Sequence, residues 1–275
     1  FFILYNKIKD KTPTQIEEKY DLNSEEAELL LPAMTIYKTI LEITNAKKFI
    51  AASVLLEDLL LQEMLFPQIA ERLNNIFDVN TILSAISIGK KYKYNKAHAD
   101  AVERYSLKIF DSIKGIHGLD ERKRIILQVA AILHDTGKFM SLKNHYYHSY
   151  DIIMASNILG LNNREKEIVA NIAKFHSRIL PDMRDADYNR LPRNDRVLIS
   201  KLTAILRIGD ALDKPHSQKI DKIRAEVVED TLIIKAISKK STLLEEWTVK
   251  QKSGLFKEVF GLKTEFKRVI EERGI

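Results

Sequence analysis

The sequence predicts a mainly α-helical protein, in which a helical bundle is flanked by a small N-terminal α/β piece and a C-terminal ββαβ unit. From about Asn80 to Gln218, apolar residues recur at spacings of three and four, which is the period of an amphipathic helix. After Ser217 the pattern changes to short alternating segments that suit strands. Ahead of the bundle, the apolar run from Lys47 to Leu56 suits a buried strand.

The N-terminal piece contains one clear helix signal. Asn23 and Glu26 form a capping-box pattern, which predicts a helix from about Ser24 to Glu42. After the predicted strand, a further helix is expected at Leu59–Leu65. A domain boundary follows between Pro67 and Asp78.

Within the bundle, the segment from Lys96 to Ile113 has a one-sided apolar pattern, and the apolar run from Ile125 to Leu133 predicts a buried central helix. The next helix, DIIMASNILG, is expected to end at Gly160, a residue type that commonly caps helices. Two more follow: NREKEIVANIAKFHSRIL, closed by Pro181, and a long last helix that starts at about Asp195.

The C-terminal unit is expected to have strands KIRAEVV and TLIIKAI around a turn at Glu229-Asp230. A helix from Leu243 to Phe260 and a strand from Leu262 to Val269 complete it. The predicted domains are therefore residues 1–75, 76–217 and 218–275.

Composition excludes several classes of protein. Hydrophobic residues make up 45% and charged residues 30% of the 275 residues, which is the balance of an ordinary globular protein. The chain has no cysteine, which excludes disulfides and zinc-thiolate sites and fits a reducing cytoplasm. Its longest apolar run, Ile50–Leu56, is far below the roughly 18 residues needed to span a bilayer. The first residue is not methionine, so we expect a part of a longer protein.

The formal net charge is +6, which favours anionic partners such as nucleotides, polyphosphate or RNA. Solvated, lysine-rich helices would give the same charge. Arginines interleaved with aromatic residues, which an RNA-binding surface would require, are not evident.

Histidine and aspartate residues carry the strongest chemical signal. His134 and Asp135 are adjacent at the end of the predicted central helix, just before Gly137, where both side chains can face one cleft. An imidazole and a carboxylate are typical ligands of divalent transition metals. His98 and Asp210 lie on two other predicted helices, and a bundle can direct such residues inward.

The set His98, His134-Asp135 and Asp210 resembles the H…HD…D signature of the HD superfamily of metal-dependent phosphohydrolases. The resemblance implies that these residues bind one metal ion and that Asp135 bridges to a second. It also implies second-ion ligands at His148 and His176, although His145 could replace His148 and His176 could instead cap a helix. The spacing of Asp213 from Asp210, one helical turn, suggests that it orients a ligand. His117 and His216 are expected at the surface.

Most of the chain also resembles the rear portion of Ppx/GppA proteins, the exopolyphosphatase and guanosine pentaphosphate phosphohydrolase family. Residues 29–65 are similar to the end of that family's actin-like region. LRIGDALDKPH and LFKEVFGLKTEFKRV are similar to its helical region and C-terminal domain. The resemblance places the family's phosphate-binding loops in actin-like domains, and this chain has no glycine-rich phosphate loop.

These patterns predict a cytoplasmic hydrolase that uses one or two divalent ions (Mn, Fe or Mg) on a phosphoester or phosphoanhydride of the nucleotide, alarmone or polyphosphate class. Asp135 and Lys138 are its candidate catalytic residues, while Arg178 and Arg207 are candidate phosphate clamps. Each of Lys138, Arg178 and Arg207 could instead be an ordinary solvated surface charge. Arg207 could also form an ion pair with Asp210. The alternative function is a non-catalytic module that binds polyphosphate or RNA and dimerises, and family resemblance favours a homodimer with either function.

Overall fold

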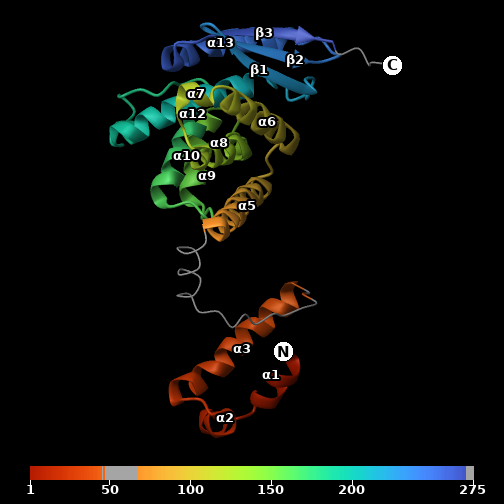
Figure 1. The fold of residues 1–275 in the computed structure, drawn as a ribbon, viewed down its shortest axis with the longest axis vertical. Helices are drawn as coiled ribbons and strands as arrows, with labels where there is room; N and C mark the ends of the chain where they lie inside the picture. The colour runs from red at the N-terminus through yellow and green to blue at the C-terminus, as the bar shows by residue number, and fades with distance from the viewer. Residues whose placement is uncertain (45, 47–66, 271–275) are drawn as a thin grey trace. The chain divides into compact units, whose positions relative to one another are not determined.

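The computed structural model describes residues 1–44, 46 and 67–270, and it divides the chain into two units, Phe1–Pro67 and Gln68–Ile275 (Figure 1). The prediction of a mainly α-helical protein is confirmed. The expected strand Lys47–Leu56 and helix Leu59–Leu65 lie outside the described residues.

The first unit contains helices α1 (Phe2–Ile8), α2 (Pro13–Tyr20) and α3 (Ser24–Thr44). The predicted capping box is confirmed: the backbone N–H of Glu26 donates to Asn23 Oδ1 at 2.8 Å, and that of Asn23 donates to Glu26 Oε2 at 3.1 Å. Buried side chains from all three helices form a small core: Ile8, Ile16, Ala27 and Met34.

The second unit is a bundle around α8, as its apolar sequence predicts. Every residue of α8 from Ile125 to Leu133 is buried except Gln128. Helices α6, α10 and α12 pack against it. The bundle consists of α5 (Pro67–Lys91), α6 (Lys96–Ser112), α7 (Lys114–His117), α8 (Glu121–Leu133), the 3₁₀ helix η1 (Thr136–Phe139), α9 (His145–Ala155), α10 (Asn163–Phe175), α11 (Ala186–Asn189) and α12 (Arg193–Ala211).

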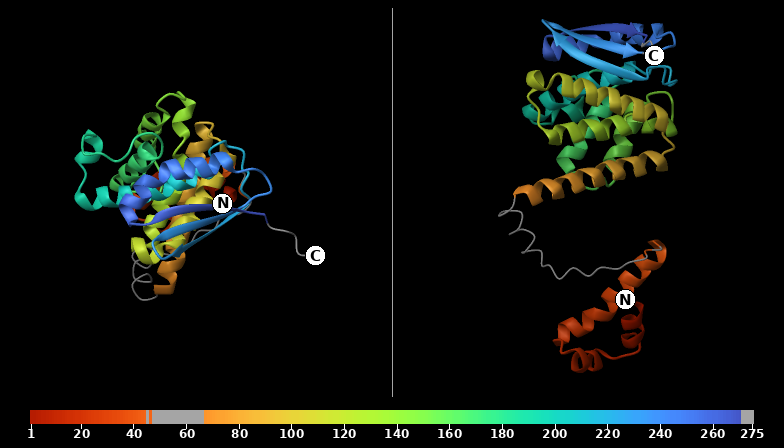
Figure 2. Two further views of the ribbon diagram at one scale, coloured as in Figure 1. Left: turned by 90° about the horizontal axis from the view of Figure 1, so that it is seen from above. Right: turned by 45° about the vertical axis from the view of Figure 1, so that its right-hand side comes forward.

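The C-terminal part has the predicted ββαβ order: β1 (Lys222–Val228), β2 (Thr231–Ile237), α13 (Leu243–Phe260) and β3 (Lys263–Val269). Strand β2 lies in the centre, antiparallel to β1 and parallel to β3. The parallel pair needs a crossover, which α13 provides. Helix α13 packs on α12, so the sheet and α13 cover one end of the bundle (Figures 1 and 2).

A single hydrophobic core joins the bundle and the C-terminal part, because Phe256 of α13 and Ile234 of β2 belong to the same buried cluster as α8 and α12. The predicted domain borders at 75 and 217 remain predictions.

Two helices end earlier than predicted: α10 ends at Phe175 rather than at Leu180, and α9 also stops short of its predicted end. Helix α9 begins at His145 and ends at Ala155, rather than continuing to Gly160. Ser156 is extended, with ψ 149°, and Ile158 turns inward to be buried. Gly160 instead lies in the following turn, with φ +80°. The earlier start has a functional consequence, since it places His145 in the first turn of α9.

Gly137 allows η1 and α9 to approach closely. A Cβ atom at this position would lie 2.0 Å from the His145 carbonyl oxygen and 2.4 Å from the Ser149 nitrogen. The N–H of Gly137 also donates to Ser149 Oγ at 2.9 Å, and that hydroxyl donates to the His134 carbonyl at 2.7 Å. The approach therefore fixes α9 against the end of α8.

We expect Gly137→Ala to lower the free energy of unfolding by about 1–3 kcal/mol, because backbone atoms must move to accept the methyl group. The matched control is Gly254→Ala in α13, where a Cβ would have no neighbour within 4 Å. In that variant the free energy of unfolding should rise by about 0.5–1 kcal/mol, because alanine has a higher helix propensity than glycine. Urea unfolding measures both values, and equal midpoints for the two variants would contradict the packing argument.

Candidate metal centre

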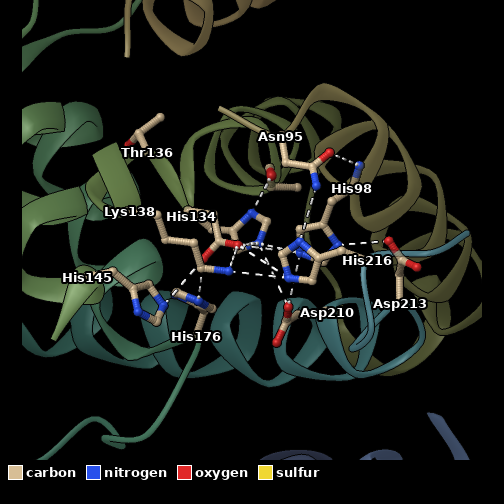
Figure 3. A network of polar contacts seen from close by, with 12 residues as sticks. Asn95, His98, His134, Thr136, Lys138, His145, His176, Asp210, Asp213 and His216 are labelled. Atoms are coloured by element: carbon tan, nitrogen blue, oxygen red, sulfur yellow. Dashed lines mark hydrogen bonds and ion pairs between the residues drawn. The ribbon is translucent and has the colours of Figure 1, made fainter. Parts of the chain in front are cut away.

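Four helices direct histidine and aspartate side chains into the middle of the bundle (Figure 3). His98 lies in the first turn of α6, and Asp210 in the last turn of α12. His134 and His176 directly follow the last residues of α8 and α10, and Asp135 leads into η1. All five side chains are buried. The structure thus brings together five of the six residues predicted to bind metal.

One oxygen of Asp135 faces one half of this cluster. Asp135 Oδ2 lies 3.6 Å from Nε2 of His98 and 3.6 Å from Nε2 of His134. Asp210 Oδ1 lies 3.4 Å and 3.8 Å from the same two nitrogens. The two Nε2 atoms are 3.2 Å apart. Ligand atoms of His98, His134 and Asp210 are thus close enough to share one ion.

The other oxygen of Asp135 faces a second group. Asp135 Oδ1 lies 3.5 Å from His176 Nε2 and 3.3 Å from His145 Nε2. It is a buried atom that finds no hydrogen-bond partner within the part of the chain that the structure describes. Burying a carboxylate oxygen without a partner is costly. A cation at this oxygen would remove that cost, so the donor set fits a carboxylate that bridges two metal positions.

The three central histidines present the same ring nitrogen to the cluster because their other nitrogen is already bound. Nδ1 of His134 donates to the Ala131 carbonyl at 2.7 Å, and Nδ1 of His176 donates to the Ala173 carbonyl at 2.6 Å. Both histidines use the carbonyl three residues earlier, which is free at a helix end. Such second contacts fix the tautomer that leaves Nε2 available for a metal.

His98 obtains the same arrangement from Asp213, whose Oδ2 accepts from His98 Nδ1 at 2.8 Å. Asp213 had been expected to support a ligand from its spacing to Asp210, and it supports His98. Its Oδ1 also accepts the backbone N–H groups of Ser217 and Gln218. Asp213 thus connects the cluster to the turn that leads into the sheet.

Neighbouring groups set the protonation states of the histidines and aspartates in the cluster. Burial disfavours the charged form of His98, but hydrogen bonds to Asp210 and Asp213 outweigh it and raise the pKa of His98 to about 9. Burial lowers the pKa of His134 to about 3. For Asp135 and Asp210, burial would raise the pKa. Contacts of Asp135 with His134, His176 and the Lys138 ammonium, and the ammonium of Lys252 beside Asp210, hold the pKa of each carboxyl well below its usual range. The two carboxylates are therefore ionised.

Two lysines that are not among the candidate metal ligands contact these carboxylates. Lys138, in η1, donates to Asp135 Oδ2, and its Nζ also lies 3.3 Å from His216 Nε2. Lys252, in α13, donates to Asp210 Oδ2 and, at 3.2 Å, to the His176 carbonyl. The pKa of Lys252 is lowered, and burial of its ammonium group is the main cause.

Sequence reasoning missed Lys252 and misplaced two histidines. Lys252 follows Val249 by three residues and precedes Phe256 by four, so the buried stripe of α13 contained the signal. His216 was expected at the surface, but its ring stacks on His98 with centroids 3.6 Å apart. His117 is buried as well, and its Nε2 donates to the Phe110 carbonyl.

The remaining predicted residues lie apart from the cluster. His148 is half-buried, and among the described residues it has no hydrogen bond or ion pair to the cluster; His145 takes the position beside Asp135. Arg178 is exposed. Arg207 is buried, and its guanidinium donates to the Phe175, Ser177 and Ile179 carbonyls at the end of α10. These contacts stabilise a helix end and do not direct Arg207 to a phosphate.

In a comparison with protein-family models, residues 82–258 match the model for Ppx/GppA phosphatase, domain III. The chain belongs to the Ppx/GppA phosphatase family. The match runs from α5 to α13 and contains the whole histidine–aspartate cluster and Lys252. A comparison with curated proteins found no match. Among the described helices, none is both long and apolar enough to cross a membrane.

We expect Lys252→Met to lower the free energy of unfolding of the metal-free protein by about 3 kcal/mol, since it leaves the buried Asp210 carboxylate without its cation. Lys250→Met, at an exposed position of the same helix, is the matched control. Adding Asp210→Asn should recover part of the loss, which a double-mutant cycle in urea measures. A Lys252 variant as stable as the Lys250 variant would show that the ion pair contributes nothing.

Proposed function

We propose that this chain is a metal-dependent phosphohydrolase that cleaves a phosphoester or phosphoanhydride. The observation that carries the proposal is Asp135, whose two oxygens face two separate histidine groups while one of them has no hydrogen-bond partner among the described residues. Membership of a phosphatase family supports the reaction class. The histidine–aspartate cluster lies within the matched region.

Two overlapping sets of residues would hold the ions. His98, His134, Asp135 and Asp210 would hold the first, while Asp135, His176 and His145 would hold the second, with His148 the alternative that the sequence suggested. Imidazole nitrogens in both sets favour Mn or Fe over Mg, which prefers oxygen ligands. Bound divalent ions lower the pKa of a coordinated water and hold phosphoryl oxygens.

The other residues of the site would act on substrate charge and orientation. Lys138 places an ammonium group beside Asp135 at the edge of the cluster, where it can neutralise charge that develops on a phosphoryl group. Asp213 keeps the His98 ring in place. Arg178 remains a candidate substrate contact because it is exposed and close in sequence to His176, whereas the contacts of Arg207 favour a structural role.

A second candidate function follows from the net charge of +6, which favours binding of polyphosphate or RNA without catalysis. In that case the chain would serve as an accessory and dimerisation module. The homodimer, RNA as a partner and the cytoplasmic location stay predictions. The two functions differ in one measurable property, because only the first requires hydrolysis that depends on a divalent ion.

Asp135→Asn is expected to abolish both metal binding and hydrolysis, because it removes the only carboxylate shared by the two sets. Elemental analysis of protein purified without chelator and reconstituted with Mn²⁺ or Fe²⁺ should give about one or two ions per chain for the wild type. Release of p-nitrophenol from p-nitrophenyl phosphate and from its bis-ester measures activity. The control, Asp151→Asn on the exposed side of α9, should behave as the wild type. Wild-type protein that stays metal-free after reconstitution would favour the accessory module.

Alanine variants of His145 and His148 test separately which histidine of α9 holds the second ion. We expect His145→Ala to reduce a stoichiometry of about two ions to about one, while His148→Ala retains both, because His145 and not His148 lies against Asp135 Oδ1. The reverse result would show that α9 rotates to present His148 when the ions bind. Elemental analysis of the two variants, reconstituted side by side, provides the measurement.

A further inference from the structure

A cavity of about 360 Å³ opens onto the Asp135 side of the metal centre. The turn 92–95 between α5 and α6 forms one wall, η1 and Leu142 form another, and His216 completes it. Ligand pockets usually have volumes of about 300–1,000 Å³ and combine apolar walls with a few polar groups. The cavity is thus large enough for a substrate of moderate size.

The inner end of the cavity is polar. Asp135, Lys138 and His216 line it, with Lys138 Nζ between the Asp135 carboxylate and His216 Nε2. Figure 3 shows Lys138 beside His176 and His145, at the edge of the cluster. A phosphate group that entered here would meet the ammonium of Lys138 next to the proposed metal positions.

The outer end is aromatic and apolar. Tyr92 and Phe139 meet edge to face, with ring centroids 5.7 Å apart and an interplanar angle of 79°. Phe139 is 52% exposed and Leu142 is 77% exposed, so part of this apolar wall is open to solvent. Exposed aromatic surface beside a charged site is typical of a surface that binds a ligand.

Two residues of the cavity wall have unusual backbone conformations. Lys93 and His216, which both line the cavity, have φ values of +48° and +53°, in the left-handed region that residues with a Cβ rarely adopt. Asn95 and His216 lie within hydrogen-bond distance, with Nδ2 and Nδ1 3.4 Å apart. Asn95 Oδ1 also accepts the N–H of His98. Strain of this kind concentrates at ligand sites.

From these features we propose that the cavity binds a nucleoside phosphate, with its base on the Tyr92–Phe139 wall and its phosphate at Lys138. The inference rests on the proposed function, since it places the phosphate of the substrate at the metal centre. A polyphosphate chain fits this lining less well. Among the described residues that line the cavity, only Lys93 and Lys138 are cationic, and an inorganic chain would gain nothing from the aromatic wall.

The test compares ligands with and without a base. Adenosine 5′-monophosphate, tripolyphosphate and orthophosphate would each be titrated calorimetrically into the 275-residue chain, with and without Mn²⁺, after its metal content is measured. Phe139→Ala should weaken adenosine monophosphate binding about tenfold or more, because stacking on an aromatic ring is lost. Its affinity for tripolyphosphate and its metal content should stay unchanged. Phe139→Tyr should restore the nucleotide affinity.

Phe2→Ala serves as the matched control, since Phe2 is similarly exposed, at 47%, in the other unit. A Mn²⁺-loaded protein that binds tripolyphosphate but not the nucleotide would overturn the inference and leave the proposed function intact. Equal loss of both ligands in Phe139→Ala would also overturn it. A chain that binds no Mn²⁺ would defeat the proposed function, and a Phe139-dependent nucleotide affinity would still support the binding site.

Discussion

The burial of two ionised carboxylates, Asp135 and Asp210, is the constraint on which the arrangement around the site depends. A buried charge is tolerated only when it is paired or hydrogen-bonded. Each carboxylate accordingly has its own lysine, and both face His98. This compensation uses Oδ2 of Asp135 and leaves Oδ1 without a hydrogen bond among the described residues. The incomplete compensation distinguishes the site from an ordinary buried ion-pair network and favours a cation-binding role.

Helix ends explain how the bundle builds this site. His134 and His176 occupy equivalent positions, one residue beyond α8 and α10, and each uses a carbonyl that no helical N–H can reach. Because this contact fixes Nδ1, the ring presents Nε2 to the centre in both cases. Two separate helix ends therefore give both imidazole rings the same orientation. The apolar segments that precede them, such as Ile125–Leu133, bury those ends in the core.

Much of the fold and the centre of the site could be predicted from the sequence, because both depend on patterns local in the chain. Apolar periodicity located α8 and α13, and the His134-Asp135 pair located the cluster. The failures involve contacts between distant segments. The predicted helix ran from Asp151 to Gly160, whereas α9 runs from His145 to Ala155, so the prediction left His145 outside the helix although it named His145 as an alternative ligand. His216 follows the end of α12, and no pattern near it indicates that its ring stacks on His98.

Lys252 is the most informative of these failures, because it shows that the C-terminal part does more than extend the core. Its ammonium reaches Asp210 and the carbonyl of His176, so it contacts residues on both α12 and the end of α10. Phe256, one turn later on α13, is packed in the same core as these helices. The position of α13 therefore determines the electrostatic environment of Asp210. It follows that the bundle, although it supplies every candidate metal ligand, has its native charge balance only when α13 is folded against it.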